Sequence, residues 1–282
     1  AEKHWKDVEK LSSISSGYGR IGRICPIIHE RVYKLALSRR EDAKKNWGKF
    51  KWDVIKKHEL VSLDAAPYGL IYDNFSARIY PSKACHSLAQ ACSLNHVEFR
   101  ENTKVTDFDS NAIYGEWGKE TASSIIIASG YEGFDFIKSY FPITIGSGVK
   151  GQAALIDIDL RDMPQIYANG IYVVPHSDGT TTIGSTSESN WLEPFNTDYQ
   201  LHELINRAED ICPTIKNAKL IKKWAGIRPK ARRREPLIGK IPRSDSIYLA
   251  MGGFKIGFGI AHEIGVSVAD LIENKPNSLP KS

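Results

Sequence analysis

A length of 282 residues, 41% hydrophobic content and a net charge of +5 describe a globular chain of one large domain or two joined ones. So mild a charge could attract nucleic acid or any small anion, and a solvated basic surface is the plain alternative, so nucleic acid is not the expected partner. No apolar run reaches the ~20 residues of a membrane span or forms a signal-peptide core. None of the four cysteines forms a CxxC pair, so zinc spacing is absent, and the count is low for a disulfide scaffold. We therefore expect a cytoplasmic protein without a metal site.

The amino-terminal part is expected to hold little regular structure before one helix. Residues 1–10 are charged and offer little to bury. Residues 12–26 are rich in Ser and Gly and end at Pro26, which predicts a loop that approaches something closely. Residues 29–47 place apolar side chains among charges at helical spacing and predict an amphipathic helix.

The next segments predict a mixture of strands and a helix. Residues 76–81 predict a short strand, and residues 81–91 predict a helix capped by Ser82. The alternation in residues 97–109 is typical of paired strands. Residues 124–130 form an apolar run that ends in small residues, which predicts a buried parallel strand directed at a ligand.

The following segments predict a hairpin and a surface helix. Residues 171–175 and 180–186 flank Ser177-Asp178-Gly179, which is a hairpin signal. Residues 199–211 predict a helix that ends before Pro213.

The last third predicts a ligand-binding arrangement. Residues 246–253 read as a strand that ends in a double glycine, and apolar side chains recur at helical spacing from residue 260 to residue 272. A strand, a glycine-rich turn and a helix present backbone N–H groups and the helix dipole to whatever lies at the turn. Mixed elements with parallel-type strands indicate an α/β or α+β fold.

Gly17-Tyr18-Gly19-Arg20-Ile21-Gly22 is a literal GxGxxG motif. The dinucleotide-binding fingerprint requires a hydrophobic strand before the motif and a helix that opens at its last glycine. A polar segment precedes it here and Pro26 follows closely, so we interpret it as a glycine-rich loop.

Seven segments match one protein family in the family's order. The chain resembles the glycine oxidase and D-amino-acid oxidase family of FAD-dependent oxidoreductases from about residue 12 to residue 273. The matching segments are SSGYGRIGRICP, ARIYPSKACHSLAQAC with VEFRENTKV, SIIIASGYEG, GVKGQ, IYVVPHSDGTTTIGSTSE, WAGIRPKARRREPLIGKIP and YLAMGGFKIGFGIA.

The resemblance implies an α/β (α+β) fold in which a Rossmann-like FAD-binding domain is interleaved with an antiparallel-sheet substrate domain. The FAD-binding domain is expected at residues 1–62, 76–140 and 236–282, and the substrate-binding domain at residues 63–75 and 141–235. The family's amino-terminal strand–GxGxxG–helix unit has no counterpart among the matching segments, so we expect an amino-terminally truncated FAD-binding domain. A homo-oligomer, or a partner polypeptide that supplies this unit, stays open.

The resemblance also assigns site residues. Arg228 would bind the substrate carboxylate by two parallel hydrogen bonds, Tyr172 would donate to the same group, and Lys255 would lie near the substrate. Each has a plain alternative: a surface ion pair for Arg228, a core tyrosine for Tyr172 and a solvated lysine for Lys255. No residue is assigned as a catalytic acid or base. The implied cofactor-binding residues are Ser16, Gly17, Ile21, Gly22, Arg23, Val105, Gly130, Gly253, Phe254, Ile256, Gly257, Phe258 and Gly259.

The resulting functional hypothesis is an oxidase or dehydrogenase that transfers a hydride from the C–N carbon of a small amine or amino acid to FAD. Two alternatives remain. One is a flavin-dependent oxidase that modifies the wobble uridine of transfer RNA, which the run Arg232–Arg234 would suit. The other is an inactive or partial family member that cannot hold FAD alone.

Overall fold

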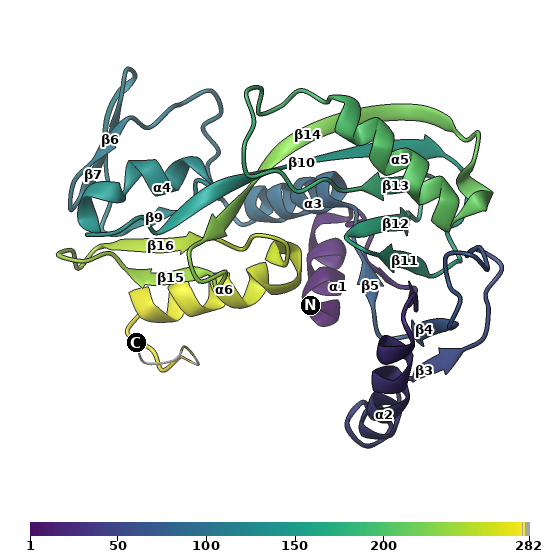
Figure 1. Cartoon of the computed structure of the whole chain (residues 1–282). Coiled ribbons are helices and arrows are strands. Elements are labelled where there is room, and N and C mark those ends of the chain that lie inside the picture. The colour runs from purple at the N-terminus through teal and green to yellow at the C-terminus, as the bar shows by residue number, and fades with distance from the viewer. Residues whose placement is uncertain (278, 280–282) are drawn as a thin grey trace. The chain divides into compact units, whose positions relative to one another are not determined.

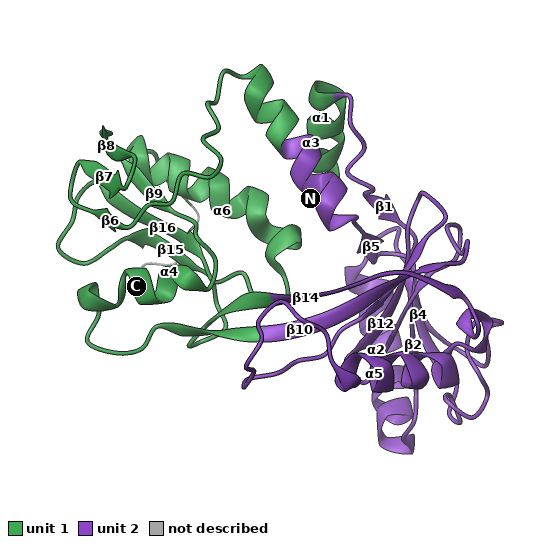
Figure 2. Cartoon of the chain, turned by 90° about the horizontal axis from the view of Figure 1, so that it is seen from above, with its two compact units in different colours: residues 1–12, 89–149, 227–282 green, residues 13–88, 150–226 purple. Residues whose placement is uncertain are grey.

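The computed structural model describes residues 1–277 and 279 and divides into two compact units (Figures 1 and 2). Unit 1 comprises Ala1–Ser12, Ala89–Val149 and Ile227–Ser282, and unit 2 comprises Ser13–Leu88 and Lys150–Gly226. Both units are therefore assembled from segments that are distant in the sequence. The expected FAD-binding and substrate-binding segments stay predictions.

Unit 2 is built on a sheet of eight strands in the order β14-β10-β13-β12-β11-β2-β4-β3, and β10 and β14 continue into unit 1. β12 pairs antiparallel with β11 and with β13, whereas β11 pairs parallel with β2. The strands are β2 (Arg23–Pro26), β3 (Trp52–Ile55), β4 (Leu70–Asp73), β10 (Gly146–Asp157), β11 (Gln165–Ala168), β12 (Ile171–Pro175), β13 (Thr181–Gly184) and β14 (Lys219–Ala231). Helices α2 (Glu30–Asn46), α5 (Tyr199–Ile211) and η2 (Pro213–Ile215), the start of α3 (Pro81–Leu94), and the pair β1 (Gly19–Arg20) and β5 (Ala77–Arg78) complete the unit.

The core of unit 2 follows from two periodicities. Along β12, Ile171 and Val173 are 3% and 2% exposed, whereas Tyr172 between them is 37% exposed, because alternate side chains of a strand face opposite sides. Helix α5 buries Leu201 and Leu204 on one face and packs on β12 and β13.

Unit 1 contains two three-stranded sheets, β15-β16-β9 and β6-β7-β8. The central strand β16 pairs parallel with β9 and antiparallel with β15, and α6 packs along this sheet (Figure 1). The elements are β6 (Asp107–Phe108), β7 (Ala112–Gly115), β8 (Gly118–Thr121), β9 (Ile125–Ile127), β15 (Leu237–Lys240), β16 (Ile247–Met251), α1 (Glu2–Ser12), α4 (Glu132–Phe136), η1 (Lys138–Tyr140) and α6 (Gly257–Ile272). Their core is aromatic and aliphatic, with Phe134, Ile137 and Ile247 fully or almost fully buried.

Many sequence-based predictions are confirmed. Helices α2, α5 and α6, the parallel strand β9 and the β12–β13 hairpin lie where the sequence placed them, and the fold class is mixed α/β. No helix opens at the last glycine of the GxGxxG motif, because β2 begins one residue after Gly22. The motif therefore lacks the structural context of a dinucleotide fingerprint.

Other predictions were wrong. The amino-terminal residues are not poor in burial, since Trp5 of α1 is 2% exposed and packs 6.4 Å from the ring of Phe258. Residues 12–26 are not loop throughout, because Ile24 is fully buried in β2.

Two local predictions were also wrong. Of residues 97–109, only Asp107–Phe108 forms a strand, and Val97 and Phe99 are 50% and 53% exposed, so their alternation marks no buried face. Ser82 lies inside α3, which begins at Pro81, because proline suits the first helical position and has no N–H that needs a capping acceptor.

Candidate functional site

The turn between β16 and α6 in unit 1 is open to a ligand. Gly252 has a φ of +83° and Phe254 a φ of 44°, so the chain reverses sharply before α6. No side chain caps α6, and a Cβ on Gly257 or Gly259 would meet nothing within 4 Å. The first N–H groups of a helix have no intrahelical acceptor, and the helix dipole is positive there. This helix start therefore suits an electron-rich planar group.

Strand β14 lies against the same turn. An antiparallel bridge joins Lys230 to Gly253, and the N–H of Phe254 donates to the carbonyl of Pro229 at 3.1 Å. Arg228 lies two residues before this bridge and Lys255 two residues after it, and the positive charge of Arg228 acts on the Lys255 ammonium. The structure thus brings two of the predicted substrate-binding residues together.

The charges at this turn affect one another. The pKa of Lys255 is lowered from its ordinary value, first by burial and then by the positive charges of Arg228 and Arg234. Arg234 was not among the predicted site residues, although the run of three arginines at residues 232–234 could have indicated positive charge there. A cluster of guanidinium and ammonium groups beside a helix start can bind a carboxylate.

Two further predicted residues of unit 1 lie near strand ends. Gly130 follows β9 and has a φ of +66°, and a Cβ there would meet nothing within 4 Å. Because β9 and β16 are parallel, Gly130 and Gly253 follow the carboxyl ends of neighbouring strands, where open α/β sheets bind ligands. Val105 is half-buried just before β6, outside any strand. Its assigned contact with FAD stays a prediction.

In unit 2, packing within the chain accounts for two of the predicted glycines. Gly17 has a φ of +70°, and a Cβ there would lie 2.6 Å from the Cβ of Tyr80. Gly22 has a φ of +77°, and a Cβ there would lie 2.4 Å from the carbonyl oxygen of Asp73. Ser16 is fully buried, and its carbonyl accepts a hydrogen bond from Tyr80 N–H at 3.1 Å. These positions are constrained whether or not they also contact a cofactor.

Tyr172 and Arg23 interact in unit 2. Ile21, two residues before Arg23 in the sequence, is half-buried. The pKa of Tyr172 is raised from its ordinary value by burial and by Tyr167, whose ring lies 4.5 Å away, and Arg23 acts in the opposite direction. The Nε of Arg23 lies 3.4 Å from a carboxylate oxygen of Asp73. An anchored cation thus lies beside the tyrosine, as a carboxylate-binding pair requires.

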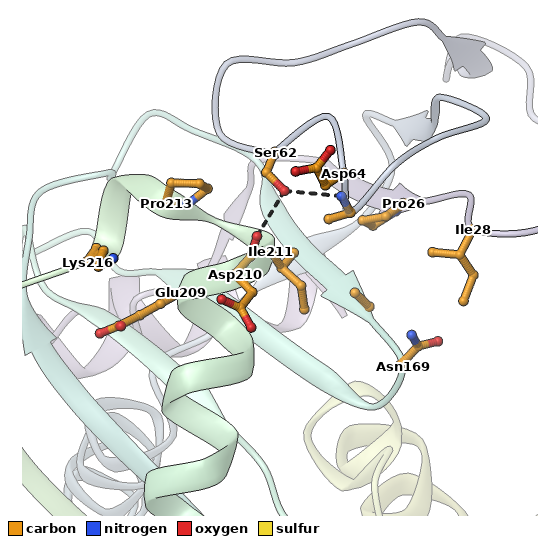
Figure 3. Close-up of a pocket in the computed structure, with 12 residues that line it drawn as sticks. Pro26, Ile28, Ser62, Asp64, Asn169, Glu209, Asp210, Ile211, Pro213 and Lys216 are labelled. Carbon is orange, nitrogen blue, oxygen red and sulfur yellow. Dashed lines mark hydrogen bonds between the residues drawn. The ribbon is translucent and has the colours of Figure 1, made fainter.

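A separate cleft of about 600 Å³ lies in unit 2, between the end of α5 and the loops near β2 and β11 (Figure 3). The hydroxyl of Ser62 donates to the carbonyl of Asp210 at 2.9 Å and accepts from Ala65 N–H at 3.2 Å. None of the sequence-predicted site residues lines this cleft. The predicted site and the cleft are therefore different places.

Two features are absent from the described residues. No three His, Cys, Asp or Glu side chains among residues 1–277 and 279 gather closely enough to hold a metal ion. Within the same part of the chain, no helix combines the length and apolarity needed to cross a lipid bilayer.

The parallel β9–β16 pair, the glycine turn and α6 form a strand–turn–helix unit of an α/β fold. A sequence profile of the FAD dependent oxidoreductase family, DAO, matches residues 1–271, and the chain belongs to this family. The expected lack of an amino-terminal GxGxxG unit stays a prediction.

Known relatives agree with this assignment. The glycine oxidase of Bacillus subtilis is 28% identical over 231 residues, which cover 80% of this chain. The chain spans 62% of the length of that relative and 58% of the length of the Bacillus licheniformis glycine oxidase, which is about three fifths of these curated relatives.

Solved structures show the same fold. The glycine oxidase of Geobacillus kaustophilus superimposes with a TM-score of 0.88 at 22% identity, covering 99% of this chain and 78% of that one. The iminodiacetate oxidase of Chelativorans sp. BNC1 does so with a TM-score of 0.84 at 16% identity, covering 99% and 79%.

Proposed function

We propose that the chain acts in the FAD-dependent oxidation of the C–N bond of a small amine or amino acid. The observation that supports this most directly is the turn of unit 1, where Arg228 and Lys255 lie beside the uncapped start of α6. The family profile over residues 1–271 supplies the cofactor class. The substrate class comes from the cations, because a guanidinium binds a carboxylate better than any other side chain does.

The residues of unit 1 fit one edge of a flavin ring. When bound, a flavin would supply the acceptor for the hydride of the carbon that carries nitrogen; the nitrogen would lose a proton, and water would hydrolyse the resulting imine to a carbonyl compound and ammonia or an amine. The open backbone at Gly257 and Gly259 would leave room for a planar group, since a Cβ placed there meets no atom within 4 Å apart from the adjacent residues and the backbone of the helix itself. The N–H groups of this helix start would favour the negative charge that reduction adds to the ring.

Arg228 and Lys255 would act on the substrate. Arg228 would bind the carboxylate and so fix which C–H bond of the substrate faces the cofactor. Lys255, whose pKa is lowered by burial and by Arg228, would add positive charge beside the bound anion. Tyr172 and Arg23 of unit 2 keep their predicted roles and can be tested separately by Tyr172→Phe and Arg23→Lys.

The test starts from the visible absorption of the purified chain. A yellow protein whose flavin is bleached anaerobically by an amino acid would support the proposal, and oxygen consumption would separate an oxidase from a dehydrogenase. Arg228→Leu should lower kcat/KM for carboxylate-bearing amines roughly 10- to 100-fold, with partial recovery in Arg228→Lys. The exposed Arg207→Leu on α5 is the matched control and should leave the kinetics unchanged.

Three outcomes would contradict the proposal. A colourless chain that does not take up added FAD would favour the inactive or partial family member. Salt-dependent retention on transfer RNA, without bleaching by any free amine, would favour the RNA-modifying alternative. Unchanged kinetics in Arg228→Leu would remove the role assigned to that residue.

A further inference from the structure

Three cations of unit 1 come from separate points of the chain and gather at one turn. The bridge between Lys230 and Gly253 brings the strand that carries Arg228 against the turn that carries Lys255, and the charge of Arg228 acts on that lysine. Arg234 belongs to a tight turn in which its N–H donates to the carbonyl of Ala231 at 2.9 Å. That turn packs against the double glycine, since a Cβ on Gly252 would lie 3.1 Å from the Cβ of Ala231.

Backbone hydrogen bonds hold the arginine turn in place. The N–H of Arg232 donates to the carbonyl of Ile145 at 2.8 Å, which ties the turn to the residue before β10. Arg234 itself has a φ of 65°, so the chain reverses there and returns toward β15. The guanidinium of Arg234 is therefore carried on an anchored turn near Lys255.

Arg234 and Lys255 bring two positive charges to this turn. In the described ranges 1–277 and 279, no ion pair joins Arg234 or Lys255 to a carboxylate. The pKa of Lys255 is lowered first by burial and then by Arg228 and Arg234, and no carboxylate acts against this lowering. Like charges held together in this way favour an anion that carries more than one negative charge.

We propose that the substrate is an amine with two carboxylates, one bound by Arg228 and the other by Arg234 together with Lys255. The inference rests on the proposed function, because Arg228 keeps the role given to it there. An amine with a single carboxylate would leave Arg234 and Lys255 beside each other without a counterion, and it should bind more weakly for that reason. Arg234 is then the residue that determines specificity.

Iminodiacetate and N-methylglycine are matched probes, because both are achiral secondary amines and they differ by one carboxylate. Titration calorimetry with the flavin-loaded protein should give a dissociation constant at least about tenfold lower for iminodiacetate. Arg234→Gln should weaken iminodiacetate about tenfold and change N-methylglycine by less than about twofold. Arg233→Gln removes the same charge from the neighbouring position of the same turn and should affect neither probe.

A second measurement does not depend on turnover. NMR of the dimethylated Lys255 amine reports its titration, and Arg234→Gln should move its pKa back toward the ordinary lysine value, whereas Arg233→Gln should not. Saturating iminodiacetate should raise this pKa more than saturating N-methylglycine does, because it brings a second negative charge.

Equal affinities of the wild-type protein for the two probes, or equal effects of Arg234→Gln and Arg233→Gln, would overturn the two-carboxylate inference. The proposed function would survive that result if either amine bleaches the flavin and Arg228→Leu prevents the bleaching. Loss of both probes in Arg228→Leu, with selective loss of iminodiacetate in Arg234→Gln, would support both proposals.

Discussion

His176 of unit 2 should make the stability of the protein depend on pH. It follows β12, is 3% exposed, and its Nε2 lies 2.8 Å from the hydroxyl of Thr182. Its ring packs on Tyr80 at a centroid distance of 4.2 Å, and its buried Nδ1 has no hydrogen-bond partner within the described part of the chain. Burial lowers the pKa of His176 from 6.5 to about 4, and Arg78 acts in the same direction.

The sign of the effect follows from this lowered pKa. As the pH falls, the unfolded chain takes up a proton on this histidine near pH 6.5, whereas the folded chain does so only near pH 4. The neutral buried ring therefore gives its full contribution above pH 6.5 and loses it between pH 6.5 and 4. Linkage over that interval gives a loss in the free energy of unfolding of about 2 kcal/mol at pH 5 and about 3 kcal/mol at pH 4.

Urea unfolding followed by circular dichroism at pH 7, 6 and 5 measures this loss. Between pH 7 and 5 the wild-type protein should lose about 2 kcal/mol more than His176→Gln, because the other histidines contribute equally to both proteins. The exposed His202→Gln on α5 should follow the wild type. If His176→Gln lost as much stability over this interval as the wild type, the argument from burial would be wrong.

Two further predictions concern packing in unit 2. Lys150→Met should lower the free energy of unfolding by about 3 kcal/mol. The buried carboxylate of Glu188, which is 7% exposed and lies 3.7 Å from the Lys150 ammonium, would lose its counterion. Adding Glu188→Leu should therefore recover most of the loss. Gly22→Ala should lower the free energy of unfolding by more than about 2 kcal/mol, because its Cβ would meet the carbonyl oxygen of Asp73. Gly170 is also at positive φ, but a Cβ there would meet nothing within 4 Å, so Gly170→Ala should cost only about 1 kcal/mol. Urea midpoints decide both, and a Gly170→Ala as damaging as Gly22→Ala would contradict the second.

Sequence periodicity predicted those elements whose burial is decided locally. Leu201, Leu204 and Ala208 repeat at helical spacing, and α5 buries all three. Apolar and polar residues alternate equally well over residues 97–105, yet this segment forms no strand. A strand needs a neighbouring strand to pair with, and the alternation gives no information about that neighbour. The helix at residues 2–12 was not predicted, because its one large buried side chain, Trp5, packs near Phe258, which is distant in the sequence.

Local sequence patterns also predicted one part of the candidate site and missed another. The glycine turn before α6 was visible in the sequence, because a double glycine between a strand pattern and a helix pattern is a local signal. The pairing of Arg228 with Lys255 depends on the bridge between Lys230 and Gly253, which joins segments that no local pattern connects. Only the family resemblance brought those two residues together beforehand, and Arg234 was added by the turn that follows β14.

The contact between Trp5 and Phe258 has a consequence for synthesis of the protein. The indole leaves the ribosome roughly 250 residues before the ring that covers it, which at usual elongation rates is a delay of about 13 to 50 s. During that interval Trp5 lacks the ring that packs near it in the folded protein. All of Ser13–Leu88 and Lys150–Gly226 has by then been translated, so the purple unit of Figure 2 can mature first and the green one last.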